Sequence, residues 1–351
     1  MAKRDITNAI KIAEQLARVQ GNVFIKDLLR KKKRTESRIR IGATKDAILE
    51  NLIEAIQEGY ITRTDLDLWV QEVEGWGKQH VYLYRVAKSL ADDPLWQSRP
   101  AVQRKIKQTL GIELSDIVSA RLEYPEDLKI SDAEFSGGVL ALVWRRRYEL
   151  WDRDKSKDER RTIDGDVYQF RAYRQQLNRA VTRFVVNLKD GLAALFLQIP
   201  LADPAHAAAR DMVKETVDAI FPWDRLKPVN LSEAIKTIDG QELRSAQAGR
   251  DSQIVAQSTR FAAAGASVAF EADPGNTQWK SVEAVRRVRG ALKERDFTGD
   301  SATFQVRLRG QEGMSRDVLM SLHAKQRRVY LSARMTASEV WSALGPIYEA
   351  R

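Results

Sequence analysis

The spacing of apolar residues changes near residue 134, and this change limits the possible fold classes. Before it, apolar side chains recur at helical spacing, as in the stretch from Ile48 to Ile56. After it, short apolar runs of strand length follow turn residues, as in the run from Val139 to Trp144 behind Gly137 and Gly138. A set of helices followed by strands predicts an α+β protein that begins with an all-helical module.

The 351-residue chain is long enough for three units. We expect a basic helical module over residues 1–112 and an α+β domain with an antiparallel sheet over 113–230. A second, smaller α+β domain, suited to interaction or dimerisation, would occupy residues 231–351. The helical module would end with helices from Val81 to Leu90 and from Pro100 to Leu110. The charged residues 152–161 predict a solvated loop, and the polar residues 240–260 predict a linker or an exposed helix.

Positive charge is concentrated near the amino terminus. The whole chain has a net charge of +10, and residues 1–45 contain thirteen of its basic and only four of its acidic side chains. We use the name basic run for residues 26–45, whose cations are Lys26, Arg30, Lys31, Lys32, Lys33, Arg34, Arg38, Arg40 and Lys45. The following residues 46–75 are strongly acidic, with Arg63 as their one basic residue. A cluster of cationic residues in one part of the chain is typical of a protein that binds a polyanion, most often nucleic acid.

Further arginines lie on predicted strands. Arg145 and Arg147 follow the apolar run and would point to one face of a sheet, and Arg171 and Arg174 lie on the next strand. Tyr148, Trp151, Tyr168 and Tyr173 lie among these arginines. Aromatic rings interleaved with arginine can stack on bases or can simply cover a sheet, and both interpretations stay open here.

Motifs of catalysis are absent from the sequence. The chain has no cysteine, no phosphate-binding glycine loop and no serine nucleophile motif, and its three histidines are widely separated. The nearest pattern to a metal-dependent nuclease is Glu271 and Asp273 followed by Lys280, and its spacing is wrong. We therefore expect no enzymatic activity, no cofactor and no metal.

The segment that begins at Thr44, TKDAILENLIEAIQEGYITRTDLDLWVQEVEGWGKQHVYLY, resembles the amino-terminal helical module of the centromere protein N family of kinetochore proteins. The order of elements over residues 133–200 is similar to the second domain of that family, and the carboxy-terminal part to its dimerisation region. The resemblance implies a basic groove for duplex DNA between the two domains. The groove residues that it implies in this chain are Lys45, Lys78, Arg145, Arg147, Arg171 and Arg174. The dense stretch from Arg30 to Arg34 departs from the pattern of the family.

These observations favour a non-catalytic DNA-binding protein that grips the phosphate backbone and belongs to a larger complex. Two alternatives stay open. The chain could be an interaction scaffold whose basic run meets an acidic partner and whose carboxy-terminal domain self-associates, or it could be a nuclease with a divergent metal site. The charged amino terminus and the lack of a long apolar stretch predict an intracellular protein, in cytoplasm, nucleoid or nucleus, that does not cross a membrane.

Overall fold

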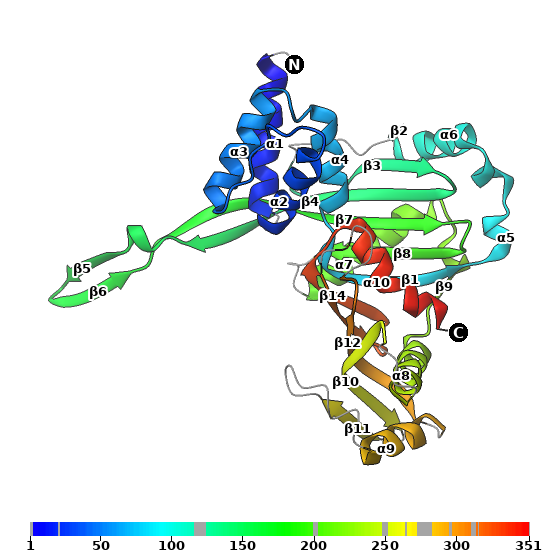
Figure 1. Cartoon of the computed structure of the whole chain (residues 1–351). Helices are drawn as coiled ribbons and strands as arrows, with labels where there is room; N and C mark the ends of the chain where they lie inside the picture. The colour runs from blue at the N-terminus through cyan, green and yellow to red at the C-terminus, as the bar shows by residue number, and fades with distance from the viewer. Residues whose placement is uncertain are drawn as a thin grey trace.

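The computed structural model shows a helical module beside a broad sheet, with a two-stranded arm projecting from the same side of the molecule as the module (Figure 1). The residues that the structure describes are 3–19, 22–115, 124–198, 203–247, 252–263, 265–271, 283–294, 297–309, 314 and 316–350. Helices come first and the sheet follows, so the predicted α+β class is confirmed.

Four helices form the module: α1 (Lys3–Val19), α2 (Asn22–Lys33), α3 (Lys45–Gln57) and α4 (Arg63–Val73). They enclose a core of their own, in which Ile12, Leu29 and Leu66 are almost completely buried. The hydroxyl of Thr44 accepts a hydrogen bond from the amide of Ala47 and so caps α3. Thr62 caps α4 in a capping box. The sequence predicts one helix start at Thr44 and another at either Thr62 or Thr64, and the structure confirms the starts at Thr44 and Thr62.

The predicted helix from Val81 to Leu90 is wrong, because most of this segment is strand β1 (Gly77–Val86). Only its last residues are helical, in the short α5 (Lys88–Ala91). Val81 and Leu83 face one core while Tyr84 and Val86 face another, so both sides of the strand are apolar. An apolar run of this kind does not distinguish a buried strand from a helix by spacing alone.

Among the described residues, twelve strands join one sheet. Its order is β11-β10-β12-β13-β14-β1-β8-β7-β4-β3-β2, with β9 pairing to β1 as well. Neighbouring strands are antiparallel, except for the parallel pair β2 and β3. Besides β1, the strands of this sheet are β2 (Leu114–Ser115), β3 (Lys129–Ser136), β4 (Val139–Arg153), β7 (Tyr173–Asn187), β8 (Leu192–Gln198), β9 (Leu226–Pro228), β10 (Ile254–Ala263), β11 (Ala266–Glu271), β12 (Thr298–Val306), β13 (Val318–His323) and β14 (Arg328–Arg334). Lys189-Asp190-Gly191 between two apolar runs predicts a hairpin, and the structure confirms it, because these residues join β7 and β8.

Helices cover both faces of the sheet, each over a separate core. On one face, α6 (Arg99–Leu110) and α7 (Asp203–Asp218) pack against β4, β7 and β8. On the other face, α8 (Leu231–Gln247) and α10 (Ala337–Glu349) pack against β8, β1, β14, β13 and β12, which are neighbours in the sheet. The remaining helices are α9 (Glu283–Glu294) and the short turns η1 (Pro94–Gln97), η2 (Lys155–Lys157) and η3 (Trp223–Arg225).

One continuous sheet runs across the domain boundaries that we expected at residues 112 and 230. The helical core ends at Val73, and β1 already belongs to the sheet. β1 pairs with β8 on one side and with β14 on the other, so strands from the expected second and third units share one hydrogen-bonded sheet. Residues 240–260 are also part of the folded body, since α8 and β10 occupy their described portions.

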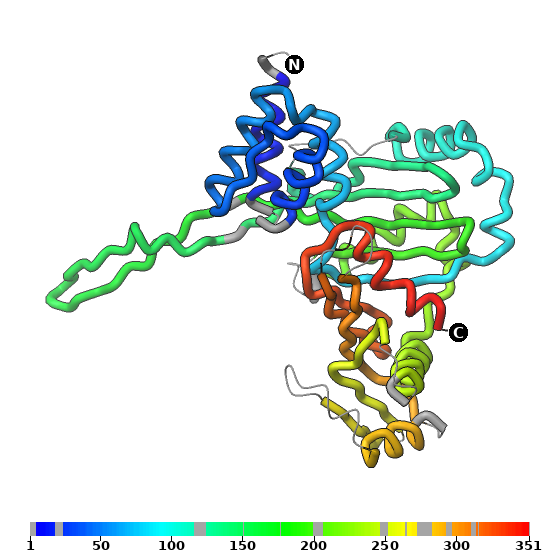
Figure 2. The backbone as a smooth tube through the Cα atoms, in the orientation of Figure 1, coloured from blue at the N-terminus to red at the C-terminus, as the bar shows by residue number. Residues whose placement is uncertain are grey.

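The arm replaces the loop expected at residues 152–161. β4 and β7 pair continuously from Val139 opposite Asn187 to Arg153 opposite Tyr173. Beyond them, β5 (Glu159–Ile163) and β6 (Asp166–Phe170) form a separate two-stranded tip, which extends far from the body (Figure 2). Every residue of β5 and β6 is exposed. A charged segment without apolar anchors was therefore compatible with a solvated strand as well as with a loop.

None of the helices in the described part of the chain is long and apolar enough to cross a membrane.

Candidate nucleic-acid interface

The basic run occupies the end of α2, the loop behind it and the first residue of α3. Arg30, Lys31, Lys32 and Lys33 form the last turn of α2. Cations at this end of a helix interact favourably with its dipole, so part of the run stabilises its own helix.

Four of the nine cations in the run have carboxylate partners. The pairs are Arg30–Asp27, Lys32–Asp65, Arg38–Glu36 and Arg40–Glu54. Two of these carboxylates, Asp65 and Glu54, come from the acidic residues 46–75. That stretch therefore neutralises part of the run.

The carboxylates of two of these pairs have lowered pKa values. The hydrogen bond from Arg38 lowers the pKa of Glu36. Burial alone would raise the pKa of Asp65, but hydrogen bonds from Thr62 and Lys32 outweigh it and the net pKa is lowered. Both carboxylates are therefore ionised at neutral pH, and both pairs are formed there.

Three neighbouring cations of the run are not neutralised in this way. Lys31, Lys33 and Arg34 are exposed, and none of them forms an ion pair with a described carboxylate. We call these three residues the α2-end cations. Of the other two members, Lys45 is exposed at the start of α3, and Lys26 donates a hydrogen bond to the carbonyl of Ala43.

The second wall that we expected for a DNA groove is only partly at the surface. Arg145 is 1% exposed and ion-paired to Asp132, so this candidate is corrected: its guanidinium lies in the interior and has no access to a phosphate. Arg147 is half-buried and pairs with Glu126 at 2.6 Å. Lys78, Arg171 and Arg174 are exposed, the last two on the arm.

Arg145 belongs to a buried arginine cluster with Arg179 and Arg183, beneath the end of α4. The Nε atom of Arg179 donates to Glu74 at 2.9 Å, and Arg183 donates to the carbonyl of the same residue. Burial lowers the pKa of Arg183 to about 10, although Glu74 opposes the shift. Glu74, the residue that ends α4, thus connects the helical module to three arginines of the sheet.

Aromatic residues accompany the arginines of the arm. Trp151, Tyr168 and Tyr173 are 60%, 48% and 51% exposed, while Tyr148 is half-buried. The guanidinium of Arg153 lies over the ring of Tyr173 and pairs with Asp158. The rings of Trp151, Tyr168 and Tyr173 therefore do not cover the core of the sheet. Covering a sheet was one of the two interpretations that the sequence left open, and stacking on bases was the other.

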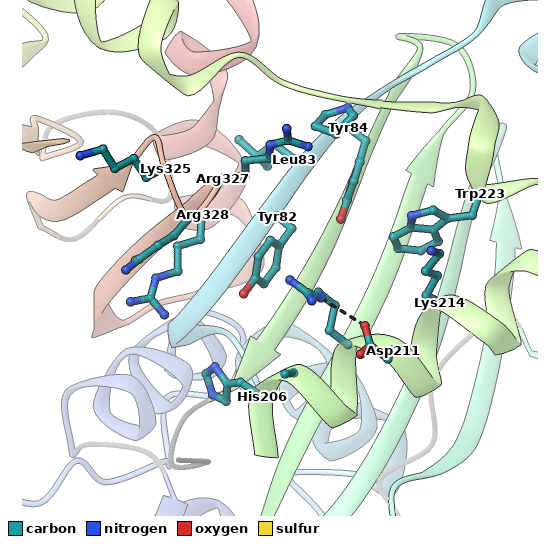
Figure 3. A pocket seen from close by; sticks show the side chains of 14 residues that line it. Tyr82, Leu83, Tyr84, His206, Asp211, Lys214, Trp223, Lys325, Arg327 and Arg328 are labelled. Atoms are coloured by element: carbon teal, nitrogen blue, oxygen red, sulfur yellow. Dashed lines mark ion pairs between the residues drawn. The ribbon is translucent and has the colours of Figure 1, made fainter. Parts of the chain in front are cut away.

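A cationic cleft lies elsewhere, at residues that no motif of the sequence marks as a site. Along one edge of β1, the pairing partner changes from β14 to β9, and the turn between β13 and β14 lies beside this change. A cleft of about 600 Å³ opens there between this turn, α7 and η3 (Figure 3). Its charged and aromatic lining comes from four separate segments: Tyr82, Tyr84, Arg210, Asp211, Lys214, Trp223, Lys325, Arg327 and Arg328.

The structure brings two of the three histidines together at the rim of this cleft. The rings of His80 and His206 lie 4.6 Å apart in an edge-to-face arrangement. In the described part of the chain, no group of three or more His, Asp or Glu side chains is placed to hold a metal ion. Asp273 and Lys280, which were part of the possible nuclease pattern, lie outside the described residues.

No model of a known protein family matches the chain, and no curated protein matches it either.

Proposed function

We propose that the protein is a non-catalytic DNA-binding protein that contacts the phosphate backbone through its helical module. The α2-end cations carry this proposal, because they are exposed, close together in the sequence and form no ion pair with a described carboxylate. Cations in such a position gain free energy from a polyanion by displacing its counterions, with little dependence on sequence. The resemblance to the centromere protein N family implies the same class of ligand.

The arm supplies a possible extension of this interface. It leaves the body beside the helical module (Figure 1), and Arg171 and Arg174 are exposed on it. A duplex that lies on the module could therefore also meet the arm. In this revised interface Arg145 has a structural role only.

The test is the salt dependence of duplex binding by a variant that lacks the α2-end cations, Lys31→Gln, Lys33→Gln and Arg34→Gln. Each lost phosphate contact should flatten the slope of log affinity against log salt by about 0.9, so the triple variant should lose about 2.7. A mobility-shift titration at several salt concentrations measures this slope. Lys32 is left unchanged because it pairs with Asp65.

The matched control removes three exposed cations that lie on α5, on α6 and in the turn between β7 and β8, outside the helical module and the arm. The substitutions are Lys88→Gln, Arg104→Gln and Lys189→Gln. Its net charge equals that of the test variant, and its slope should stay close to that of the wild-type protein. Equal slopes for both variants would contradict the proposed site. Single strands and RNA in the same assay decide which nucleic acid is preferred.

A second candidate function, a subunit that binds another protein, is favoured by the apolar tip of the arm. Val167 is 73% exposed, and Ile163 and Phe170 on the paired strands are also exposed. Apolar side chains concentrated on a projecting element are typical of protein contacts. If the arm is a contact of this kind, Val167→Ser with Phe170→Ser should abolish co-purification of a stoichiometric partner and leave duplex binding unchanged. Self-association through the carboxy-terminal unit and a divergent nuclease site stay predictions.

A further inference from the structure

The cationic cleft has a strong excess of positive charge. Five cationic side chains line it, Arg210, Lys214, Lys325, Arg327 and Arg328. One carboxylate among the described lining residues, that of Asp211, lies 3.5 Å from Arg210. Lys325 has a second carboxylate nearby, since its Nζ lies 3.3 Å from Asp300. Lys214 and Arg327 are exposed and form no ion pair with a described carboxylate, so an anion that enters the cleft meets cations that are not neutralised.

Three aromatic rings line the same cleft. Tyr82 and Tyr84 are two residues apart on β1 and project from it on the same side (Figure 3). The ring of Trp223 lies 5.3 Å from that of Tyr84, in an edge-to-face arrangement. Trp223 is half-buried and borders the cleft, so part of its surface is open to a flat ligand.

The hydroxyl of Tyr84 adds a neutral polar group to the lining of the cleft. Burial raises the pKa of Tyr84 to about 12, although Arg210 and Arg327 oppose the shift. The hydroxyl therefore keeps its proton at neutral pH and can donate a hydrogen bond. The opposing effect of the two arginines also places both of them within electrostatic reach of this hydroxyl.

The turn that carries two of the cations is held in a defined shape. Arg327 has a φ of 51°, in the left-handed region, and its amide donates to the carbonyl of Ala324 at 3.0 Å. The amide of Ala324 in turn donates to the carbonyl of Asp300 on β12 at 2.9 Å. Lys325 and Arg327 thus project from a turn that the sheet fixes, which lowers the entropic cost of holding an anion there.

We propose that this cleft binds a nucleoside phosphate, with the phosphate on the side of Arg327, at the turn between β13 and β14, and the base on the side of Trp223, beside Lys214 (Figure 3). Charge and aromatic surface lie side by side in a volume within the usual range of small-ligand sites. A simple inorganic anion would leave the aromatic side unused, and an uncharged aromatic ligand would leave the cations unused. The nucleoside phosphate could be a free nucleotide or the end of a nucleic-acid strand, because the two present the same chemical groups to the cleft.

The test is calorimetric titration of the full-length protein with adenosine 5′-monophosphate, adenosine and inorganic phosphate. Because the charged and stacking contacts act together, the nucleotide should bind at least about tenfold more tightly than either fragment. The double variant Lys214→Gln/Arg327→Asn should weaken nucleotide binding by about tenfold or more. Asparagine is chosen at position 327 because it tolerates the left-handed region. Trp223→Leu should weaken binding of the nucleotide but not of phosphate.

The control variant Lys88→Gln/Arg104→Gln removes the same charge at a distance and should bind the nucleotide as the wild-type protein does. Equal nucleotide affinity in the double variant and the wild type overturns the proposal, as does phosphate binding as tight as that of the nucleotide. Both exposed substitutions avoid the core, so loss of folding does not obscure the result; the urea unfolding midpoint verifies this.

Short oligonucleotides with and without a 5′-phosphate distinguish the two sources. Displacement of the nucleotide by the phosphorylated strand alone assigns the cleft to a strand end, and displacement by neither assigns it to a free nucleotide. The inference does not rest on the α2-end cations. The triple variant at Lys31, Lys33 and Arg34 should keep full nucleotide affinity, so failure of one proposal is distinguishable from failure of the other.

Discussion

The basic run and the buried arginine cluster meet two carboxylates at the end of α4. Glu72 is half-buried and lies within electrostatic reach of Lys31 in the run. Glu74 is buried and pairs with Arg179 and Arg145. Burial raises the pKa of Glu72. Burial also acts to raise the pKa of Glu74, but Arg179 and Arg145 outweigh it and the net pKa is lowered.

This difference separates two roles of the same side-chain types. From the sequence, Arg145 and the run looked like two walls of one groove. In the structure, the cluster connects the module to the sheet through paired, buried charges, while the run leaves three cations at the surface. A cation is therefore a candidate for binding a phosphate only after its burial and its carboxylate partners are known.

The largest expected effect follows from removing Glu74. The substitution Glu74→Gln would leave Arg145, Arg179 and Arg183 buried with too little negative charge, and should lower the free energy of unfolding by about 3–5 kcal/mol. Urea unfolding measures this loss. The matched change at the surface, Asp65→Asn beside Lys32, should cost less than half as much. Equal losses would show that burial does not distinguish the two groups of cations.

An intermediate effect should follow from freeing paired cations in the run. Glu36 and Glu54 neutralise Arg38 and Arg40, which are themselves well exposed. The double variant Glu36→Gln/Glu54→Gln should steepen the salt dependence of duplex binding by up to about 1.8, if both freed arginines reach phosphates. The same substitutions at Glu113 and Glu283, which pair with exposed cations outside the helical module and the arm, serve as the control. An unchanged slope would place these two arginines outside the interface.

The smallest effect concerns pH and Glu72. Because its pKa in the folded protein is raised, the carboxyl contributes stability that is fully present below the pKa of the unfolded chain and is lost as pH rises through the folded value. As pH rises through the acidic range, the wild-type protein should lose stability relative to Glu72→Gln, and the loss should be small because solvent screens a half-buried group. Urea unfolding at each pH measures the difference, and the opposite sign would contradict the assignment.

Much of the fold was readable from local signals. The caps at Thr44 and Thr62 and the hairpin around Asp190 are local sequence signals, and the structure confirms the elements that they predict. The segment from Val81 failed because its apolar residues face two different cores, and this information lies in distant parts of the chain. Local spacing describes one buried face well and two buried faces poorly.

The candidate sites were predictable only where their residues are contiguous. The basic run was visible as a dense stretch of sequence, although its ion pairs with Asp65 and Glu54 were not. The cleft was invisible because Tyr84, Lys214 and Arg327 come from three segments that only the tertiary fold brings together. The adjacent basic residues Arg327 and Arg328 were its one sequence signal, and two such residues are too common to indicate a site.

The position of β1 has a consequence for the order in which the protein can fold. In β1, Val81 pairs with Phe196 on one side and with Val329 on the other. Phe196 follows Val81 by 115 residues (196 − 81) and Val329 follows it by 248 (329 − 81), so a ribosome makes the second neighbour much later than the first. One edge of β1 therefore waits for β14 after β8 is already present, and closing so large a loop is slow. Until then the nascent protein carries an unpaired apolar strand, the kind of surface that chaperones exist to protect.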